Sequence, residues 1–317
     1  MSFYRDYFDK LAIKAWSELD FKPFETLKLT PLTPTIGAEI EGVDLTADLP
    51  EQQLAEIRRA LAERLVLVFR DQNISLDDQK RFARNFGRLH RHELAQDKTF
   101  AGRANDPELL AWKTGPDSRF TAGDAWHADV TCDEAPIAAS FLHVTKTPPY
   151  GAGDTAFANC YLAYESLSEP IKRLLDGLTA IHDGAFGWQQ GYGAQPKPGQ
   201  VFPKSRHPVV VTHPVTGRKV LFINEAFSSQ IVELARPESD ALLGFLARHI
   251  ERNLAFQARV HWTENALVVW DNWGAQHHAV WDYYPLERWG NRISAVSGER
   301  PYSPSLPLTA TSASAAE

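Results

Sequence analysis

The chain has 317 residues, of which 33 are Lys or Arg and 40 are Asp or Glu, giving a net charge of -7 and an isoelectric point near 5.9. This acidic balance, without a run of Lys and Arg, argues against a nucleic-acid-binding protein. Hydrophobic residues make up 44% of the chain, enough to bury a core, whereas no apolar stretch reaches the ~18 residues of a membrane span.

The chain is predicted to form one domain between two terminal segments. Residues 1–26 are rich in aromatic residues and are expected to be a packed or inter-subunit extension, residues 27–305 a single domain, and residues 306–317 a frayed tail. The N-terminus lacks the apolar core of a signal peptide. The two cysteines, Cys132 and Cys160, lack CxxC spacing, so we expect no disulfide scaffold and a cytoplasmic location.

In the first half of the chain, two helices and two strands are expected. Apolar residues at helical spacing and an early proline predict a helix over 50–64. A β-rich run follows at 66–69, and Ser75 is expected to cap a second helix that carries Phe82 and Phe86. A further strand is predicted over 137–145.

In the second half, a helix is expected from Ser168, with Leu174, Leu175 and Leu178 on its apolar side. The remaining expectations are a hairpin of 209–212 with 219–223, an amphipathic helix over 239–252, paired strands at 259–262 and 267–270, and a last strand at 293–296. Strands and helices do not alternate regularly, which disfavours a βαβ sheet.

The stretch 182–207 is rich in Gly, Gln, Pro and aromatic residues and has no clear assignment. Structureless loops of this length are uncommon in compact domains and often cover binding sites. An active-site lid and a variable surface insertion both remain open.

The most informative motif is His127-Ala128-Asp129. On an extended strand, side chains two residues apart point to the same side. One distant histidine would complete a set of two imidazoles and one carboxylate on one face of a metal, which suits non-haem Fe(II) and leaves positions open for substrate and oxygen.

Several further segments accompany this motif in a fixed order. They are Ile36–Leu45, Leu67–Gln72, Phe86–His92, Gly153–Thr155, and a late block with Trp270-Asp271-Asn272, His277, Arg288 and Arg292. Together they resemble the taurine/2,4-dichlorophenoxyacetate dioxygenase family over roughly residues 30 to 300. The resemblance implies a mostly β double-stranded β-helix, or jelly roll, with flanking helices, and dependence on Fe(II), 2-oxoglutarate and O2.

The resemblance implies a role for particular residues at the metal and at the cosubstrate. His127, Asp129 and His277 would be the iron ligands; His278 competes with His277, but the spacing to the two arginines favours His277. Arg288 and Thr155 would hold the distal carboxylate of 2-oxoglutarate, since a guanidinium fits a carboxylate bidentately. The alternatives are a surface ion pair of Arg288 with Glu287 or Asp282, and an ordinary strand threonine.

The resemblance also implies substrate-binding residues: Arg292 and His92 for an anionic end, the backbone N–H of Val130, and Phe227 as a pocket wall. His92 and Phe227 could instead be merely structural. Two positions depart from the taurine enzyme, because its asparagine falls on Gly123 and a smaller aromatic falls on Trp188. An anion site is therefore expected, whereas a site for a substrate amine is doubtful.

The implied reaction hydroxylates a C–H bond next to a heteroatom of a small anionic substrate and yields succinate, CO2 and a cleaved product. An alkyl sulfonate such as taurine, an alkyl sulfate ester, an aryloxy carboxylate and an unrelated small metabolite remain open as substrates. A halogenase is disfavoured because Asp129 is present. A zinc hydrolase with the same ligands and a non-catalytic jelly-roll binding protein are the other rivals. A dimer or tetramer is expected.

Overall fold

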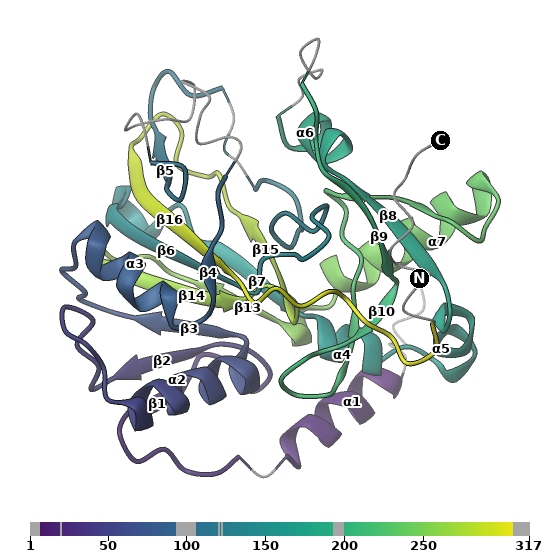
Figure 1. The fold of residues 1–317 in the computed structure, drawn as a ribbon, viewed down its shortest axis with the longest axis horizontal. Coiled ribbons are helices and arrows are strands. Elements are labelled where there is room, and N and C mark those ends of the chain that lie inside the picture. Colours follow the sequence, from purple (N-terminus) through teal and green to yellow (C-terminus); the bar gives the residue numbers. More distant parts are fainter. Residues whose placement is uncertain are drawn as a thin grey trace.

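The computed structural model describes residues 7–19, 21–92, 106–119, 121, 123–192 and 200–306. Its main feature is an eight-stranded sheet (Figure 1). The strand order is β1 (Lys28–Pro31), β2 (Ala38–Glu41), β3 (Val66–Phe69), β14 (Ala266–Asp271), β6 (Ala139–Lys146), β16 (Arg288–Val296) and β4 (Arg88–Leu89), with β5 (Leu110–Thr114) also paired to β16. All of its pairs are antiparallel except that of β2 with β3.

Three smaller sheets complete the β structure. One has the order β13 (Gln257–Val260), β7 (Thr155–Asn159) and β15 (Ala275–Ala279), and another β12 (Ser228–Ile231), β8 (Thr179–Asp183) and β9 (Lys204–Pro208). β10 (Val210–Thr212) and β11 (Lys219–Leu221) form the predicted hairpin. These antiparallel sheets, with long connections between sequential strands, confirm the predicted jelly roll.

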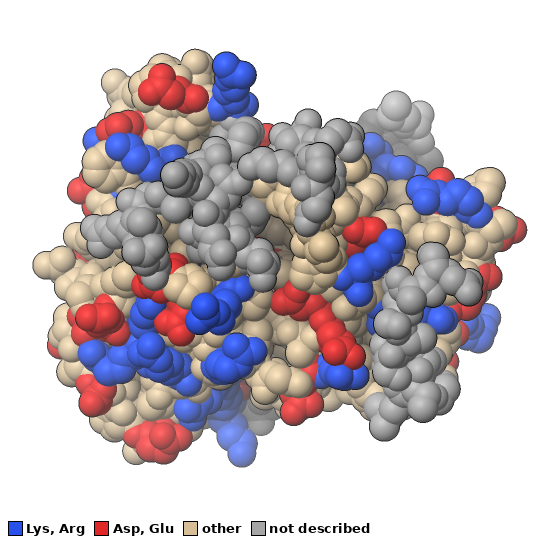
Figure 2. Space-filling model, turned by 45° about the horizontal axis from the view of Figure 1, so that its top comes forward, with Lys and Arg blue, Asp and Glu red and all other residues tan. Residues whose placement is uncertain are grey.

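Helices flank the sheets. α2 (Glu51–Arg64) and α3 (Leu76–Arg84) contact the large sheet, α1 (Tyr7–Ser17) contacts α4 (Cys160–Glu165), and α7 (Arg236–Glu251) contacts β12 and α4 (Figure 1). Ser75 caps α3 as predicted, because its hydroxyl accepts from the backbone N–H of Asp78. No helix in the described part of the chain is long and apolar enough to cross a membrane. Basic and acidic side chains are interspersed over the face shown in Figure 2.

The core has two parts. One part, between the sheets, contains Trp270, Phe157 and Tyr161, and the other, under α2 and α3, contains Phe69 and Phe141. From the N-terminal segment, Trp16 of α1 is only 2% exposed and stacks on Tyr161 with ring centroids 6.3 Å apart. At least one aromatic residue of that segment, Trp16, therefore serves to pack α1 against α4.

Two predictions about strands and helices are wrong. The strands near 259–262 and 267–270 do not pair with each other: β13 pairs with β7, while β14 lies between β3 and β6. Hydrophobic periodicity identifies a strand but not its partner, so adjacency in sequence misled the prediction. The second wrong prediction is the apolar side of the helix after Ser168. In α5 (Glu169–Leu175), Leu174 is 47% exposed and only Leu175 is fully buried.

The stretch 182–207 is not a structureless loop in its described part. His182 and Asp183 end β8, residues 184–192 form α6 (Gly184–Tyr192), and β9 begins at Lys204. Trp188 and Phe202 from this stretch line the cavity described below. Its described part therefore forms part of the cavity wall.

Candidate metal centre and active-site pocket

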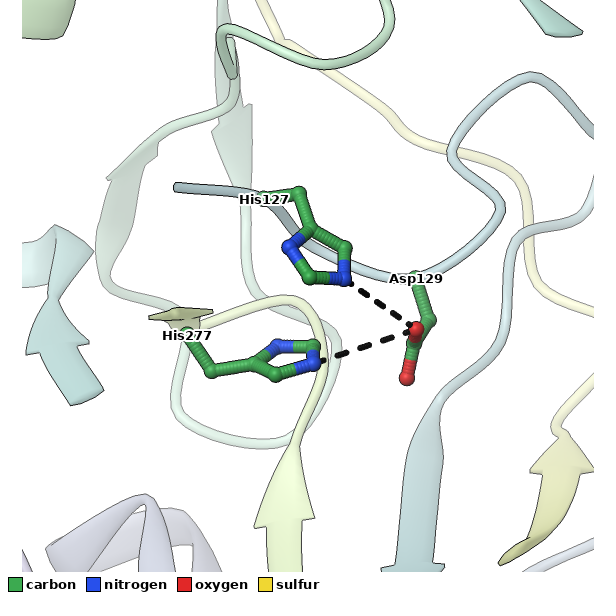
Figure 3. A group of neighbouring side chains, drawn as sticks. All are labelled: His127, Asp129 and His277. Atoms are coloured by element: carbon green, nitrogen blue, oxygen red, sulfur yellow. Dashed lines mark ion pairs between the residues drawn. The ribbon is translucent and has the colours of Figure 1, made fainter. Parts of the chain in front are cut away.

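His127, Asp129 and His277 converge in the interior (Figure 3). Each offers a ligand atom within 4.8 Å of the others, and all three residues are buried. The Oδ1 atom of Asp129 lies 3.7 Å from Nε2 of His127 and 3.9 Å from Nε2 of His277. Two imidazole nitrogens and a carboxylate oxygen thus face a common point, which is a fitting donor set for a divalent metal.

Backbone pairing places the two histidines. His127 and His277 form an isolated antiparallel bridge, with N–H to O distances of 3.0 and 2.7 Å, and their ring centroids are 4.0 Å apart. The motif does not lie on the extended strand that its spacing suggested: among the described residues, the pairing is a single bridge at His127. Val130, directly after Asp129, has a φ of 47°, and the chain turns there, although the side chains still converge.

Asn272 holds the backbone of Asp129 in place. Its Oδ1 accepts from the backbone N–H of Asp129 at 2.7 Å, and its Nδ2 donates to the carbonyl oxygens of Asp129 and Ile137 at 2.9 and 3.0 Å. Ser140 donates its hydroxyl to Oδ2 of Asp129 at 2.7 Å. Sequence reasoning assigned no role to Asn272 or Ser140; the available signal was a polar residue directly after the buried strand β14.

The tautomer of His127 suits metal binding. Nδ1 of His127 is 2.8 Å from the carbonyl oxygen of Ala125, so Nδ1 carries the proton and Nε2 is left with its lone pair. His278, the competing ligand, does not belong to the group: its ring packs edge-on against Trp126, and its Nε2 lies 3.8 Å from a carboxylate oxygen of Asp124.

The electrostatics favour a charged carboxylate at Asp129 beside a neutral imidazole at His277. Burial acts to raise the pKa of Asp129, but Arg292, His277 and His127 outweigh it and hold that pKa well below its usual range. Burial, followed by the nearby imidazole of His127, lowers the pKa of His277 well below its usual value. Both are the protonation states that a metal needs in its ligands.

A cavity of about 360 Å³ lies over the three residues. Thr155 and Arg288 are among its lining residues, and Arg288 is only 3% exposed. Nε and Nη2 of Arg288 have no hydrogen-bond partner among the described residues, and its guanidinium lies over the ring of Trp262, 5.0 Å from the centroid. Two unpartnered, buried guanidinium nitrogens fit the two oxygens of a carboxylate.

The surface ion pairs considered for Arg288 are not formed. Glu287 is bonded to Lys146 at 2.6 Å, and Asp282 lies 3.3 Å from Arg259. Thr155 accepts from the indole N–H of Trp262 at 3.1 Å, which leaves its hydroxyl hydrogen for another acceptor.

The other predicted substrate residues, Arg292, His92, Val130 and Phe227, all line the same cavity. His92 is 5% exposed, and its Nε2 has no partner within the described residues. Burial, with Arg292 and His90, lowers the pKa of His92 well below its usual value. Much of the remaining wall is apolar, with Leu110, Trp112, Leu142, Trp188, Phe202 and Phe227.

The two departures from the taurine enzyme lie at this wall. Gly123 has a φ of +85°, and a Cβ added there would stand 3.0 Å from Cε1 of His127. The carbonyl oxygen of Gly123 accepts from the backbone N–H of Ala279 at 2.7 Å. Trp188 is largely buried and borders the cavity beside Phe202, with ring centroids 5.6 Å apart.

Comparison with known proteins identifies the family. The model of the "Taurine catabolism dioxygenase TauD, TfdA family" matches residues 28–294. An alpha-ketoglutarate-dependent sulfonate dioxygenase of Saccharomyces cerevisiae is 36% identical over 290 residues, covering 87% of this chain and 68% of that protein. An alkylsulfatase of Acinetobacter baylyi is 33% identical, covering 87% of each chain.

Solved structures agree. The crystal structure of AAD-2 in complex with Mn(II) and N-oxalylglycine superimposes with a TM-score of 0.75 at 26% identity, covering 88% of this chain and 100% of that one. The family's cofactors are Fe(II), 2-oxoglutarate and O2, and the three converging ligands and the buried arginine fit them. The chain belongs to the TauD/TfdA family and is an Fe(II)- and 2-oxoglutarate-dependent dioxygenase.

Proposed function

We propose that His127, Asp129 and His277 bind the iron and that Arg288 and Thr155 hold the distal carboxylate of 2-oxoglutarate. The convergence of three buried donor atoms within 4.8 Å carries the metal assignment. The unpartnered Nε and Nη2 of Arg288 support the cosubstrate assignment, because buried guanidinium N–H groups without an acceptor are costly until an anion arrives.

For the substrate we propose a small anion with an apolar body, in the class of alkyl sulfonates and alkyl sulfate esters. Arg292 and the neutral His92 would receive the anion, since both face the cavity and Nε2 of His92 has no partner among the described residues. The aromatic wall formed by Trp188, Phe202 and Phe227 would pack on the body. Relatives whose names refer to sulfonates and alkyl sulfates support this choice.

When bound, iron with 2-oxoglutarate and O2 supplies the oxidising power to hydroxylate a C–H bond while 2-oxoglutarate becomes succinate and CO2. Hydroxylation of the carbon that bears the sulfonate or sulfate gives an adduct that splits to an aldehyde and sulfite or sulfate. The residues of this chain position the substrate: Arg292 orients the anion, and the aromatic wall excludes water from the reacting carbon.

The test is succinate release with Fe(II) and 2-oxoglutarate on taurine, hexane-1-sulfonate, hexyl sulfate, 2,4-dichlorophenoxyacetate and a blank. We expect hexane-1-sulfonate or hexyl sulfate to stimulate turnover well above taurine, with sulfite or sulfate released in equal amount to aldehyde. Preference for taurine or for the aryloxy acid would contradict the proposed substrate class.

The metal ligands are tested with a matched pair of neighbours. Equilibrium dialysis against Mn(II) should show loss of binding in His277→Ala and retention in His278→Ala, because only His277 faces Asp129. Equal loss in both would overturn the assignment. The expected homo-oligomer and cytoplasmic location stay predictions; sedimentation velocity measures the first.

A further inference from the structure

Thr131 lies two residues after Asp129 and is 1% exposed. Its side-chain oxygen is 3.0 Å from Nδ2 of Asn224 and 2.8 Å from Nδ1 of His182. Its carbonyl oxygen is 3.0 Å from Nε2 of His207. These three partners are buried and come from the connection before β12, from β8 and from β9, which together make one sheet.

The direction of the hydrogen bond between Asn224 and Thr131 follows from one backbone donor. The N–H of Phe227 donates to Oδ1 of Asn224 at 2.8 Å, so Nδ2 must face Thr131. The Thr131 oxygen therefore accepts from Asn224, which leaves its hydroxyl hydrogen and a second lone pair for the contact with Nδ1 of His182. The other ring nitrogen of His182, Nε2, lies 3.5 Å from the hydroxyl oxygen of Ser228.

The same elements support the apolar wall of the cavity. The N–H of Asp183, next to His182, donates to the carbonyl oxygen of Phe227 at 2.9 Å. The carboxylate of Asp183 accepts from the N–H of Ala185 at the start of α6. A Cβ added to Gly187 of α6 would stand 2.6 Å from the ring of Phe227, so α6 and Phe227 touch closely.

We propose that Thr131, His182, Asn224 and His207 form a positioning network that couples the turn after Asp129 to the wall made by Phe227 and α6. This inference rests on the proposed function, because the wall is where the substrate's apolar body would lie. The network holds the substrate side of the cavity at a fixed place relative to the metal side. It has no contact with the 2-oxoglutarate end at Arg288 among the contacts described, so its effect is confined to substrate placement.

The test compares Thr131→Val, which keeps the shape but removes the hydroxyl, with Thr131→Ser, which keeps the hydroxyl. Both are loaded with Mn(II) and N-oxalylglycine, so that no turnover occurs, and titrated with hexane-1-sulfonate by calorimetry. We expect Thr131→Val to weaken binding of hexane-1-sulfonate about tenfold and binding of N-oxalylglycine less than about twofold. Thr131→Ser should restore binding of the sulfonate.

A second measurement does not depend on the substrate. Amide hydrogen exchange of the metal-free protein should become faster in Thr131→Val both at 129–133 and at the distant segment 224–228, and Thr131→Ser should reverse this. If the wild-type protein binds no sulfonate, the proposed substrate class fails while exchange still tests the network.

Three results would overturn the network: unchanged exchange at 224–228 in Thr131→Val, equal defects in the Val and Ser variants, or equal weakening of sulfonate and N-oxalylglycine. Should Thr131→Val fail to fold, the same comparison is made with His182→Leu and His182→Asn. The asparagine keeps a polar atom where Nδ1 of His182 stands, and the leucine does not.

Discussion

The guanidinium of Arg292 is bonded directly to the carboxylate of Asp129, with Nη1 and Oδ1 2.5 Å apart. This is the same oxygen that faces Nε2 of His127 and of His277, while Oδ2 accepts from Ser140. The residue proposed to receive the substrate's anion therefore also occupies the oxygen proposed to bind the metal. Substrate recognition and metal binding share one charged group.

Replacing Arg292 should weaken the use of the anionic substrate but strengthen the binding of the metal. In Arg292→Gln, kcat/KM for hexane-1-sulfonate should fall by about 100-fold or more, because a buried cation that meets the anion is lost. Binding of Mn(II) to the substrate-free protein should tighten several-fold, because no guanidinium competes for Oδ1 of Asp129.

Arg259→Gln is the control for this comparison, because Arg259 is half-exposed and pairs with Asp154 outside the cavity. Dialysis against Mn(II) and steady-state kinetics should give wild-type values for it. Weaker Mn(II) binding in Arg292→Gln would show that the guanidinium supports the metal site and does not compete for it.

Arg288→Lys should raise the dissociation constant of N-oxalylglycine at least about tenfold, because an ammonium cannot reproduce the two-nitrogen contact. Metal affinity should stay within about twofold, since Arg288 is not among the three converging residues. Calorimetry on the Mn(II)-loaded protein measures both. If the lysine variant binds N-oxalylglycine as tightly as the wild type does, Arg288 does not hold the cosubstrate by a two-nitrogen contact.

The sequence predicted local elements better than their partners. The helix α2 and the strand β3 match their predicted ranges almost residue for residue, because periodicity and a proline start are local signals, as is the Ser75 cap that marks the start of α3. The pairing of β14 with β3 and β6, more than a hundred residues away in each case, has no local signal, so only the fold resemblance could suggest it.

The residues of the candidate site also differ in whether a sequence motif indicates them or only their contacts in the fold do. The residues named from the resemblance lie together around one cavity, although their roles stay proposals. Asn272 and Ser140 were missed because their importance lies in hydrogen bonds to Asp129, and an asparagine or serine near a strand end is ordinary in sequence. α6 was missed because Gly184, Gly187 and Gly191 lower its helix propensity.

The buried histidines should make stability depend on pH. Burial lowers the pKa of His207 from 6.5 to about 4, so below pH 6.5 the unfolded chain takes up a proton that the folded protein does not. The stabilisation is present above pH 6.5 and is lost as the pH falls toward 4. His207 alone should reduce the free energy of unfolding by about 2 kcal/mol between pH 7 and pH 5.

Urea unfolding of the metal-free protein at both pH values measures this effect. In His207→Gln, which keeps a side-chain N–H donor near the carbonyl oxygens of Thr131 and Asp133, the pH-dependent loss should be smaller by about that amount. His182, whose pKa burial also lowers, keeps part of the dependence in the variant. An unchanged loss between the two pH values would mean that His207 is protonated in the folded protein.

Two glycines with nearly the same left-handed φ allow the effect of backbone strain in an alanine variant to be separated from an effect on metal binding. Gly123 and Gly177 have φ values of +85° and +87°, but a Cβ at Gly123 would press on Cε1 of His127 at 3.0 Å, whereas nothing lies within 4 Å of one at Gly177. Both alanine variants should lose about 1 kcal/mol of stability from the left-handed backbone. Only Gly123→Ala should weaken Mn(II) binding, about tenfold, because His127 is held by its bond to the carbonyl oxygen of Ala125 and cannot easily turn away. Equal Mn(II) affinities in the two variants, measured by dialysis, would show that His127 has room to adjust and that the glycine is required only by the backbone.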